Sequence, residues 1–134
     1  MTNKTTNKDC VFCRMASGEI PVNKIYEDEK FFCFLDICPI NPGHLLVIPK
    51  KHDDYIFELN DKEYLELMSK TKEIAKLLKS KLKPKRVGMA VEGFGVSHIH
   101  VHLVPINKSN ELNQERKKMT EKELNKIAEK IKNG

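Results

Sequence analysis

The chain has 134 residues, of which 40% are apolar and 32% are charged, and its formal net charge is +5. This length suits one domain that buries its own core, and no run approaches the roughly 20 apolar residues that span a bilayer. We therefore expect a cytoplasmic protein with reduced thiols and no membrane partner. We interpret the polar residues 1–9 as a flexible leader and residues 10–134 as one domain, with a C-terminal loop and helix over 106–134.

The first third of the chain alternates short apolar runs with turn residues. Residues 11–17 indicate a short helix that ends at a glycine. The runs at 23–27 and 30–36 predict two strands joined as a hairpin, and the run at 43–49 predicts a third strand bounded by prolines.

The middle of the chain carries the clearest helical pattern. Asn60, or the adjacent Asp61, can cap the helix, with Glu63 placed to complete a capping box, and Pro84 ends it. The apolar positions repeat at i, i+3, i+4 and i+7, and they predict one buried face: Tyr64, Leu67, Met68, Thr71, Ala75, Leu78 and Leu82.

The basic excess is concentrated at the end of this helix, where residues 79–86 (KSKLKPKR) contain five basic side chains and no acid. Lysines near a helix C-terminus complement the helix dipole, so the segment is typical of a solvated helix end. An alternative is that it attracts polyanions such as nucleotides or RNA. Because no aromatic side chains are interleaved with the lysines, we expect no specific nucleic-acid partner.

The last third of the chain predicts two more strands and a helix. The strands are expected at 86–92 and 97–105, joined by a short turn at 93–95. The segment 107–119 is polar and aperiodic, which indicates a loop, and the final helix begins with a capping box at Thr120. Together the elements predict an α+β domain: an antiparallel sheet, a short N-terminal helix, one long central helix and a C-terminal helix.

Three of the five histidines stand at alternate positions in the sequence HIHVHLVP. On a strand, His98, His100 and His102 would share one face, with about 6.6 Å between successive Cα atoms. Two chemistries fit this arrangement. The imidazoles can bind a metal ion, or one of them can be a nucleophile or acid–base group whose tautomer is fixed by its neighbours.

Two of the four cysteines form a C-x-x-C motif at Cys10 and Cys13. Such a motif is typical of a redox pair or of half a metal site, and the βαβ pattern of a redox pair is missing. Two thiolates and two imidazoles would complete a closed tetrahedral zinc site, in which His52 and one histidine of the triplet can supply the nitrogens. Spacing alone leaves this zinc site as one open alternative.

The histidine triplet and its surroundings resemble the histidine triad (HIT) family. HIHVHLVP matches the family signature, and CVFCRMASGEIPVNKIYEDEKFFCFLDICPINPGHLLVIPKKH resembles the N-terminal half of bacterial members, so that the likeness covers residues 10–105. It implies a HIT-like fold with about five antiparallel strands and a homodimer. It also implies cleavage at the α-phosphorus of dinucleoside polyphosphates, nucleoside phosphoramidates or adenylated compounds. A purine is favoured because an apolar slot suits a large flat ring.

By position, the family's catalytic roles fall on three histidines. The resemblance implies that His100 attacks phosphorus and forms a nucleotidyl-histidine intermediate, which water then releases. A backbone carbonyl near His44 would orient the His100 ring. His102 would stabilise charge on the phosphate oxygens, and His44 would position groups or handle protons.

The resemblance also implies the metal and nucleotide ligands. Family members with C-x-x-C share a structural zinc site, whose ligands map to Cys10, Cys13, His52 and His98. Asp36 matches the acid that binds the ribose hydroxyls. The slot for the base maps to Val11, Phe12, Met15, Phe34 and Ile37.

One departure from the family concerns the loop before the triad. Many relatives carry a longer loop whose Gln and Ser or Thr contact the phosphate or the leaving group, whereas this chain has the shorter VEGFGVS. Ser97 is the nucleotide-binding candidate in this loop, and Phe94 is placed to cover the site. The identity of the leaving group is therefore open.

Three functions remain as hypotheses. The first is the nucleotide hydrolase or transferase with a His100 intermediate. The second is a nucleotide-binding regulatory module with negligible turnover, which the short loop favours. The third is a metal-dependent hydrolase that uses His98, His100 and His102 as ligands, and it differs from a protein with structural zinc in losing activity, but not stability, to chelators.

Overall fold

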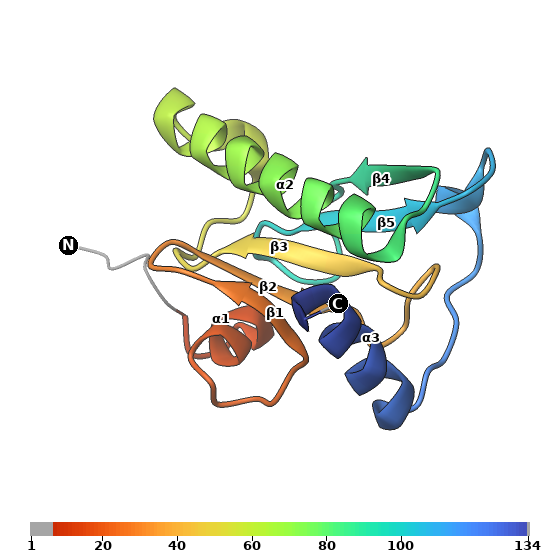
Figure 1. Cartoon of the computed structure of the whole chain (residues 1–134). Helices are drawn as coiled ribbons and strands as arrows, with labels where there is room; N and C mark the ends of the chain where they lie inside the picture. Colours follow the sequence, from red (N-terminus) through yellow and green to blue (C-terminus); the bar gives the residue numbers. More distant parts are fainter. Residues whose placement is uncertain (1–6, 134) are drawn as a thin grey trace.

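The computed structural model describes residues 7–133, which form a five-stranded antiparallel sheet with helices on both faces (Figure 1). This is the α+β, HIT-like architecture that the sequence predicts. The flexible leader expected over 1–9 lies outside the described residues up to Thr6. Asn7 and the residues after it form a turn, in which the Cys10 N–H donates to the Asn7 carbonyl at 3.0 Å.

The strands follow the order β1-β2-β3-β5-β4 across the sheet, and all neighbouring pairs are antiparallel. They are β1 (Lys24–Glu27), β2 (Phe31–Leu35), β3 (Leu45–Pro49), β4 (Arg86–Ala90) and β5 (Val101–Ile106). The helices are α1 (Val11–Ala16), α2 (Asp61–Leu82) and α3 (Glu121–Asn133), with short 3-10 turns at Ile56–Glu58 and Glu111–Asn113. No helix of the described part combines the length and apolar character needed to cross a membrane.

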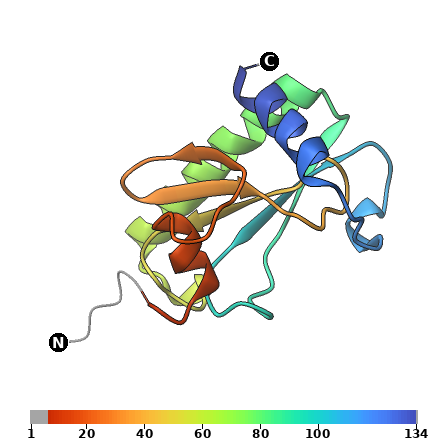
Figure 2. The same cartoon turned by 90° about the horizontal axis from the view of Figure 1, so that it is seen from below.

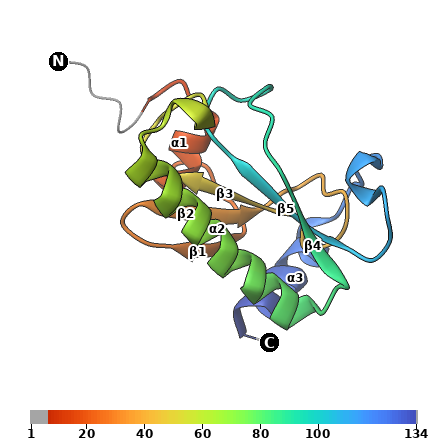
Figure 3. The same cartoon turned by 90° about the horizontal axis from the view of Figure 1, so that it is seen from above.

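Alternation along the central strands divides the core into two layers. In β2, Cys33 points to the layer that contains α2 and α3, whereas Phe32 and Phe34 point to the layer that contains α1. Figure 2 shows α1 on one face of the sheet, and Figure 3 shows α2 on the opposite face. Because both faces of β2 and β3 are covered, their sequences FFCFL and LLVIP are continuous apolar runs.

The long central helix α2 is bounded by caps at both ends. The Asn60 side chain accepts the N–H of Glu63 at 2.8 Å, which makes Asn60 the N-cap. At the other end Lys83 takes a left-handed conformation with φ of 57°, immediately before Pro84. The predicted stripe lacks Ile74, which is buried together with three of its predicted members: Leu67, Thr71 and Leu78.

The C-terminal helix α3 begins with the predicted capping box. The Thr120 hydroxyl accepts the N–H of Glu123 at 3.1 Å, and the Glu123 carboxylate accepts the N–H of Thr120 at 2.8 Å. The helix then buries one apolar face against the sheet and α2, formed by Leu124, Ala128 and Ile131.

The last strand differs from its prediction. β5 begins at Val101, whereas the sequence predicts a strand over 97–105. Residues 91–100 form a loop in place of the short turn expected at 93–95. Only the last histidine of the triplet, His102, therefore lies in a strand.

A proline explains where the strand pairing stops. Continuing the register of β3 with β5 would place Ile99 opposite Pro49, which has no N–H to donate. Ile99 instead donates its N–H to the carbonyl of Asp53 at 2.8 Å. Even so, Ile99, Val101 and Leu103 all point into the core, as their alternation with the histidines predicts.

The loop predicted at 107–119 is docked against the loop that joins β2 to β3. Buried Glu111 accepts the N–H of Asn107 and a side-chain N–H of Asn41, and these bonds lower the pKa of the Glu111 carboxyl. Lys117 donates its backbone N–H at 2.7 Å to a carbonyl of the loop that carries Asn41. These bonds hold the segment 107–119 against the loop that carries Asn41, and its only regular element among the described residues is the 3-10 turn at Glu111–Asn113.

Candidate functional site

The C-x-x-C motif meets two histidines in one cluster. Cys10 and Cys13 come from the N-terminus of α1, His52 from the segment after β3, and His98 from the loop before β5. The His98 Nδ1 lies 3.3 Å from the Cys10 Sγ, 3.5 Å from the Cys13 Sγ and 3.2 Å from the His52 Nδ1. All four donor atoms lie within 4.8 Å of one another.

This donor set fits a tetrahedral zinc ion. Zinc–nitrogen bonds of about 2.0 Å and zinc–sulfur bonds of about 2.3 Å place tetrahedral ligand atoms roughly 3.3–3.8 Å apart, close to the separations in the cluster. His98 donates its Nε2–H to the Pro49 carbonyl at 2.7 Å, which leaves the Nδ1 lone pair facing the sulfurs. Burial raises the pKa of the Cys13 thiol to about 11, so its thiolate requires a nearby cation.

His100 follows this cluster, and the backbone fixes the orientation of its ring. The His100 Nδ1 donates to the carbonyl of His98 at 2.7 Å, so the neutral ring presents an unprotonated nitrogen at Nε2. The expectation that a carbonyl near His44 has this role is wrong, because the loop conformation brings the nearer His98 carbonyl against the ring. The ring is buried and meets Phe12 edge-on, with 5.0 Å between centroids.

His44 and His102 form a hydrogen-bonded chain with a defined direction. The N–H of Ile40 donates to the His44 Nδ1 at 2.9 Å, so neutral His44 carries its proton on Nε2. That proton faces the His102 Nδ1 at 2.9 Å, which leaves the His102 proton on Nε2. The His102 and His100 rings lie 5.1 Å apart between centroids. The chain therefore ends in an N–H donor on the ring that neighbours His100.

Burial keeps both rings of this chain neutral at physiological pH. It lowers the pKa of His44 to about 4, against the opposing charge of Asp36. It also lowers the pKa of His102 to about 4, and the neighbouring His100 and the positive charge of Arg116 add to this shift. Neutral rings keep the directional pattern of donors and acceptors intact.

A second group of potential metal ligands fits hydrogen bonding better than metal binding. Asp36, His44 and His102 place donor atoms within 4.8 Å of one another. His44 faces the other two residues through its Nε2. Because its Nδ1 accepts the N–H of Ile40, the Nε2 of the neutral ring carries the proton and has no lone pair for a metal. The three histidines of the triplet do not share an ion either, because His98 turns to the cysteines while the His100 Nδ1 is bound to a carbonyl.

Asp36 follows β2 and binds an arginine that sequence reasoning missed. Its Oδ1 accepts the N–H of Cys38 at 2.9 Å, and its Oδ2 accepts from the Arg116 Nη1 at 3.0 Å. The same Oδ2 lies 3.8 Å from the His44 Nε2. Arg116 belongs to the aperiodic segment 107–119, where its only sequence signal is the charged run ERKK.

The residues predicted to form the base slot divide into two groups. Phe12 and Phe34 are buried edge to face, with 5.6 Å between ring centroids, in the layer that contains α1. Two others pack against this layer while partly exposed: Val11 and Met15. In contrast, Ile37 is 67% exposed, and Ser97 lies exposed in the loop before the triad. The structure thus brings Val11, Phe12, Met15 and Phe34 together, whereas Ile37 and Ser97 lie outside this group.

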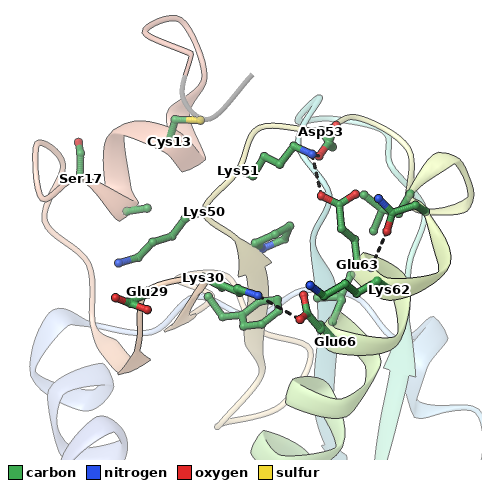
Figure 4. A pocket seen from close by; sticks show the side chains of 16 residues that line it. Cys13, Ser17, Glu29, Lys30, Lys50, Lys51, Asp53, Lys62, Glu63 and Glu66 are labelled. Atoms are coloured by element: carbon green, nitrogen blue, oxygen red, sulfur yellow. Dashed lines mark hydrogen bonds and ion pairs between the residues drawn. The ribbon is translucent and has the colours of Figure 1, made fainter. Parts of the chain in front are cut away.

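A separate cavity of about 610 Å³ opens between α1, the turn after β1 and the start of α2 (Figure 4). Its wall carries both signs of charge, since Lys30 pairs with Glu66 at 3.0 Å and Lys51 with Glu63 at 2.7 Å. Of the predicted site residues, Cys13 alone is among the described residues that line it. Balanced charge gives no preference for phosphate, so this cavity does not match the nucleotide site.

Comparison with known proteins agrees with this fold. The HIT domain family model matches residues 17–109, and the chain belongs to the HIT family. An uncharacterised HIT-like protein of Methanocaldococcus jannaschii is 37% identical over 106 residues, or 72% of this chain and 78% of the relative. The adenosine 5′-monophosphoramidase of Schizosaccharomyces pombe is 35% identical over 104 residues, or 76% of both chains. The crystal structure of a zinc-bound histidine triad family protein from Mycobacterium smegmatis matches with a TM-score of 0.76 and 30% identity, over 91% of this chain and 92% of that one.

Proposed function

We propose that this protein is a nucleotide hydrolase or transferase that cleaves a bond at the α-phosphorus of a nucleotide conjugate through a nucleotidyl-His100 intermediate. The observation that carries the proposal is the 2.7 Å hydrogen bond from the His100 Nδ1 to the carbonyl of His98. It leaves the Nε2 lone pair available for attack on phosphorus without prior loss of a proton.

The proposed reaction consists of two displacements. The His100 Nε2 forms a bond to phosphorus, and the bond to the leaving group breaks with its electron pair on the leaving group. Water then attacks the same phosphorus, the phosphorus–nitrogen bond breaks, and the nucleoside monophosphate is released. Overall, water supplies the hydroxyl that phosphorus gains and the proton that the leaving group gains.

The His44–His102 chain supports both displacements. In this proposal, the Nε2–H of His102 donates to the oxygens of the phosphoryl group, on which negative charge increases in each transition state. His44 holds His102 in the tautomer that leaves this N–H free, through their 2.9 Å contact. The donor is in place before the substrate binds, so no reorganisation is needed during the reaction.

The nucleotide is placed by the residues around Phe12 and Asp36. A purine base packs in the slot formed by the α1 layer, and the Asp36 carboxylate accepts hydrogen bonds from the ribose hydroxyls. Ile37 and Ser97 contribute from the rim, where both are exposed. The relative named adenosine 5′-monophosphoramidase makes nucleoside phosphoramidates the first substrates to test. Dinucleoside polyphosphates and adenylated compounds complete the panel.

Zinc is proposed as a structural ion held by the Cys10, Cys13, His52 and His98 cluster. It would contribute folding free energy by joining the N-terminus of α1 to the loop that carries His98. The name of the zinc-bound relative from Mycobacterium smegmatis supports the choice of metal. No step of the proposed reaction passes through this ion.

We further propose a homodimer formed through the edge of the sheet. Within residues 7–133, β4 is an edge strand with an unpaired row of backbone donors and acceptors, and its Met89 is 52% exposed. A second copy related by a two-fold axis can pair with this edge. Light scattering should give twice the mass of 15.5 kDa for the wild type and a monomer for Met89→Lys.

The proposed activity is tested with a substrate panel. Purified protein should release AMP from adenosine 5′-phosphoramidate, a diadenosine polyphosphate or an adenylated amine. His100→Gly should abolish release, with a loss of about a thousandfold or more, and its circular dichroism spectrum should show that the variant remains folded. Added imidazole should restore part of the rate in the glycine variant. Unchanged turnover of His100→Gly would overturn the assignment of the nucleophile.

A nucleotide-binding module with negligible turnover is the second candidate. The observation that favours it is the loop before the triad, where Ser97 is exposed and Phe94 is 84% exposed, so that neither replaces the Gln contact of many relatives in this structure. Labelled nucleotide trapped on His100 under conditions that spare acid-labile bonds distinguishes the two functions. Tight binding with neither adduct nor product would favour the binding module.

A further inference from the structure

Arg116 extends from the C-terminal segment to the carboxylate that we propose for ribose binding. Its Nη1 lies 3.0 Å from the Asp36 Oδ2 and 2.8 Å from the carbonyl oxygen of Cys38. These two contacts use both hydrogens of Nη1. One edge of the guanidinium is therefore fixed by the protein itself.

The backbone beside Arg116 is anchored to the same loop. Lys117 donates its N–H to the Pro39 carbonyl at 2.7 Å, and its Nζ contacts the Ile40 carbonyl. The N–H of Ile40 in turn sets the tautomer of His44. Arg116 is thus part of the structure that orients the proposed catalytic histidines, although 45% of its side chain is exposed to solvent.

Both members of the Asp36–Arg116 pair keep unused hydrogen-bonding capacity. Within residues 7–133, the Arg116 contacts account for Nη1 alone, which leaves the Nε–H and the two hydrogens of Nη2 for a ligand. Each Asp36 oxygen accepts one hydrogen bond from the chain and retains a second lone pair. The pair therefore offers acceptors and donors side by side.

We propose that Arg116 is a second ribose-binding residue, which holds the Asp36 carboxylate and donates hydrogen bonds to the ribose hydroxyl oxygens. A hydroxyl group both donates and accepts, so a carboxylate beside a guanidinium satisfies both of its capacities. The ion pair also compensates the charge of Asp36 where the sugar displaces water. This inference rests on the proposed function, because it takes the ribose to lie at Asp36.

The test compares two ligands that differ only at the sugar. The affinities of AMP and of 2′,3′-dideoxyadenosine 5′-monophosphate are measured by calorimetry for the wild type, Arg116→Gln and Lys118→Gln. Arg116→Gln should reduce the affinity for AMP by about tenfold, as expected for loss of a charged hydrogen bond. It should reduce the affinity for the dideoxy ligand by less than about twofold. Lys118→Gln removes the same charge from an exposed neighbour and should leave both affinities unchanged.

A second comparison tests whether the two residues act as one unit. In an Asp36→Asn background, Arg116→Gln should reduce the affinity for AMP much less than it does in the wild type, because the shared ribose contact is already impaired. Arg116→Lys keeps the charge but loses the planar fork, and it should recover less than half of the tenfold loss. Melting temperatures measured in parallel identify any variant whose fold has changed.

Several outcomes would overturn this role. Equal losses for AMP and the dideoxy ligand in Arg116→Gln would mean that the arginine contacts phosphate or acts through general charge. Full recovery with Arg116→Lys would lead to the same conclusion. If the wild type binds neither nucleotide, the proposed function itself fails. If AMP binds and Arg116→Gln does not change its affinity, the role of Arg116 is rejected while the proposed function stands.

Discussion

At one end of the histidine triplet, His98 is fully buried, and its Nδ1 faces two sulfurs and a second imidazole. At the other end, His102 is partly exposed and accepts a hydrogen bond from His44 in a chain that starts at a backbone N–H. The two residues are four positions apart and have the same side chain. Their different partners make one suited to a metal and the other to a phosphate, so the supporting residues determine what each imidazole can do.

The largest expected effect comes from replacing a cysteine in the proposed zinc cluster, which we call the metal end of the triplet. Cys10→Ser should abolish zinc binding and reduce the free energy of unfolding by more than about 3 kcal/mol, because a structural zinc site contributes its binding energy to folding. Bound zinc is measured by atomic absorption, and stability by denaturant unfolding. Cys38→Ser is the matched control, since Cys38 lies outside the cluster and its backbone contacts to Asp36 and Arg116 remain. Equal zinc content in the two variants would refute the ligand assignment.

The second effect is a loss of stability in acid that comes from His44 and His102, which we call the phosphate end of the triplet. The pKa of His44 and that of His102 are each lowered from 6.5 to about 4, so between these pH values the unfolded chain binds protons that the folded protein does not. Their contribution to stability is complete above pH 6.5 and is lost as the pH falls toward 4. Urea unfolding between pH 8 and 4.5 should show this decline in the free energy of unfolding. Zinc content measured at each pH distinguishes the decline from an effect of metal loss. A flat profile with zinc retained would contradict the burial argument.

A smaller effect on stability is expected when one member of the hydrogen-bonded chain is replaced. His102→Asn should cost about 1–3 kcal/mol, because the Nε2–H of fully buried His44 loses its partner. The same change should lower the rate of AMP release about a hundredfold through loss of the phosphate donor. Zinc content should not change, which distinguishes this end from the metal end. A variant that loses zinc together with activity would show that the two ends are not separable.

The smallest effect is expected on the core side of the triplet. Ile99 is 1% exposed and lies between His98 and His100, but it points away from both sites. Ile99→Val should cost roughly 1 kcal/mol through loss of one buried methylene. Zinc content and AMP release should both match wild type. A change in either would mean that the backbone at this position responds to core packing.

Much of the fold follows from the sequence because its signals are local. The continuous apolar runs FFCFL and LLVIP, the capping residues Asn60 and Thr120 and the stripe of α2 each specify an element directly. The start of β5 is not predictable in this way. It depends on Pro49, a residue of another strand that becomes its neighbour only after the sheet has formed.

The candidate site shows the same division between local and long-range information. The residue types in HIHVHLVP and C-x-x-C, with the family resemblance, are enough to place the predicted zinc ligands in one cluster. Arg116 could not be found, because it reaches Asp36 from 80 residues away and lies in a segment with no period. The hydrogen bond between His44 and His102 likewise depends on a backbone N–H whose direction no side chain encodes.

The carbonyl of His98 gives the triplet a property that substitution of side chains cannot remove. The ring of this residue faces the cysteines while its carbonyl oxygen holds the His100 ring. Replacing the His98 side chain removes one proposed zinc ligand but leaves that oxygen in the chain. The orientation of the His100 ring therefore depends on the path of the main chain and not on the imidazole of His98.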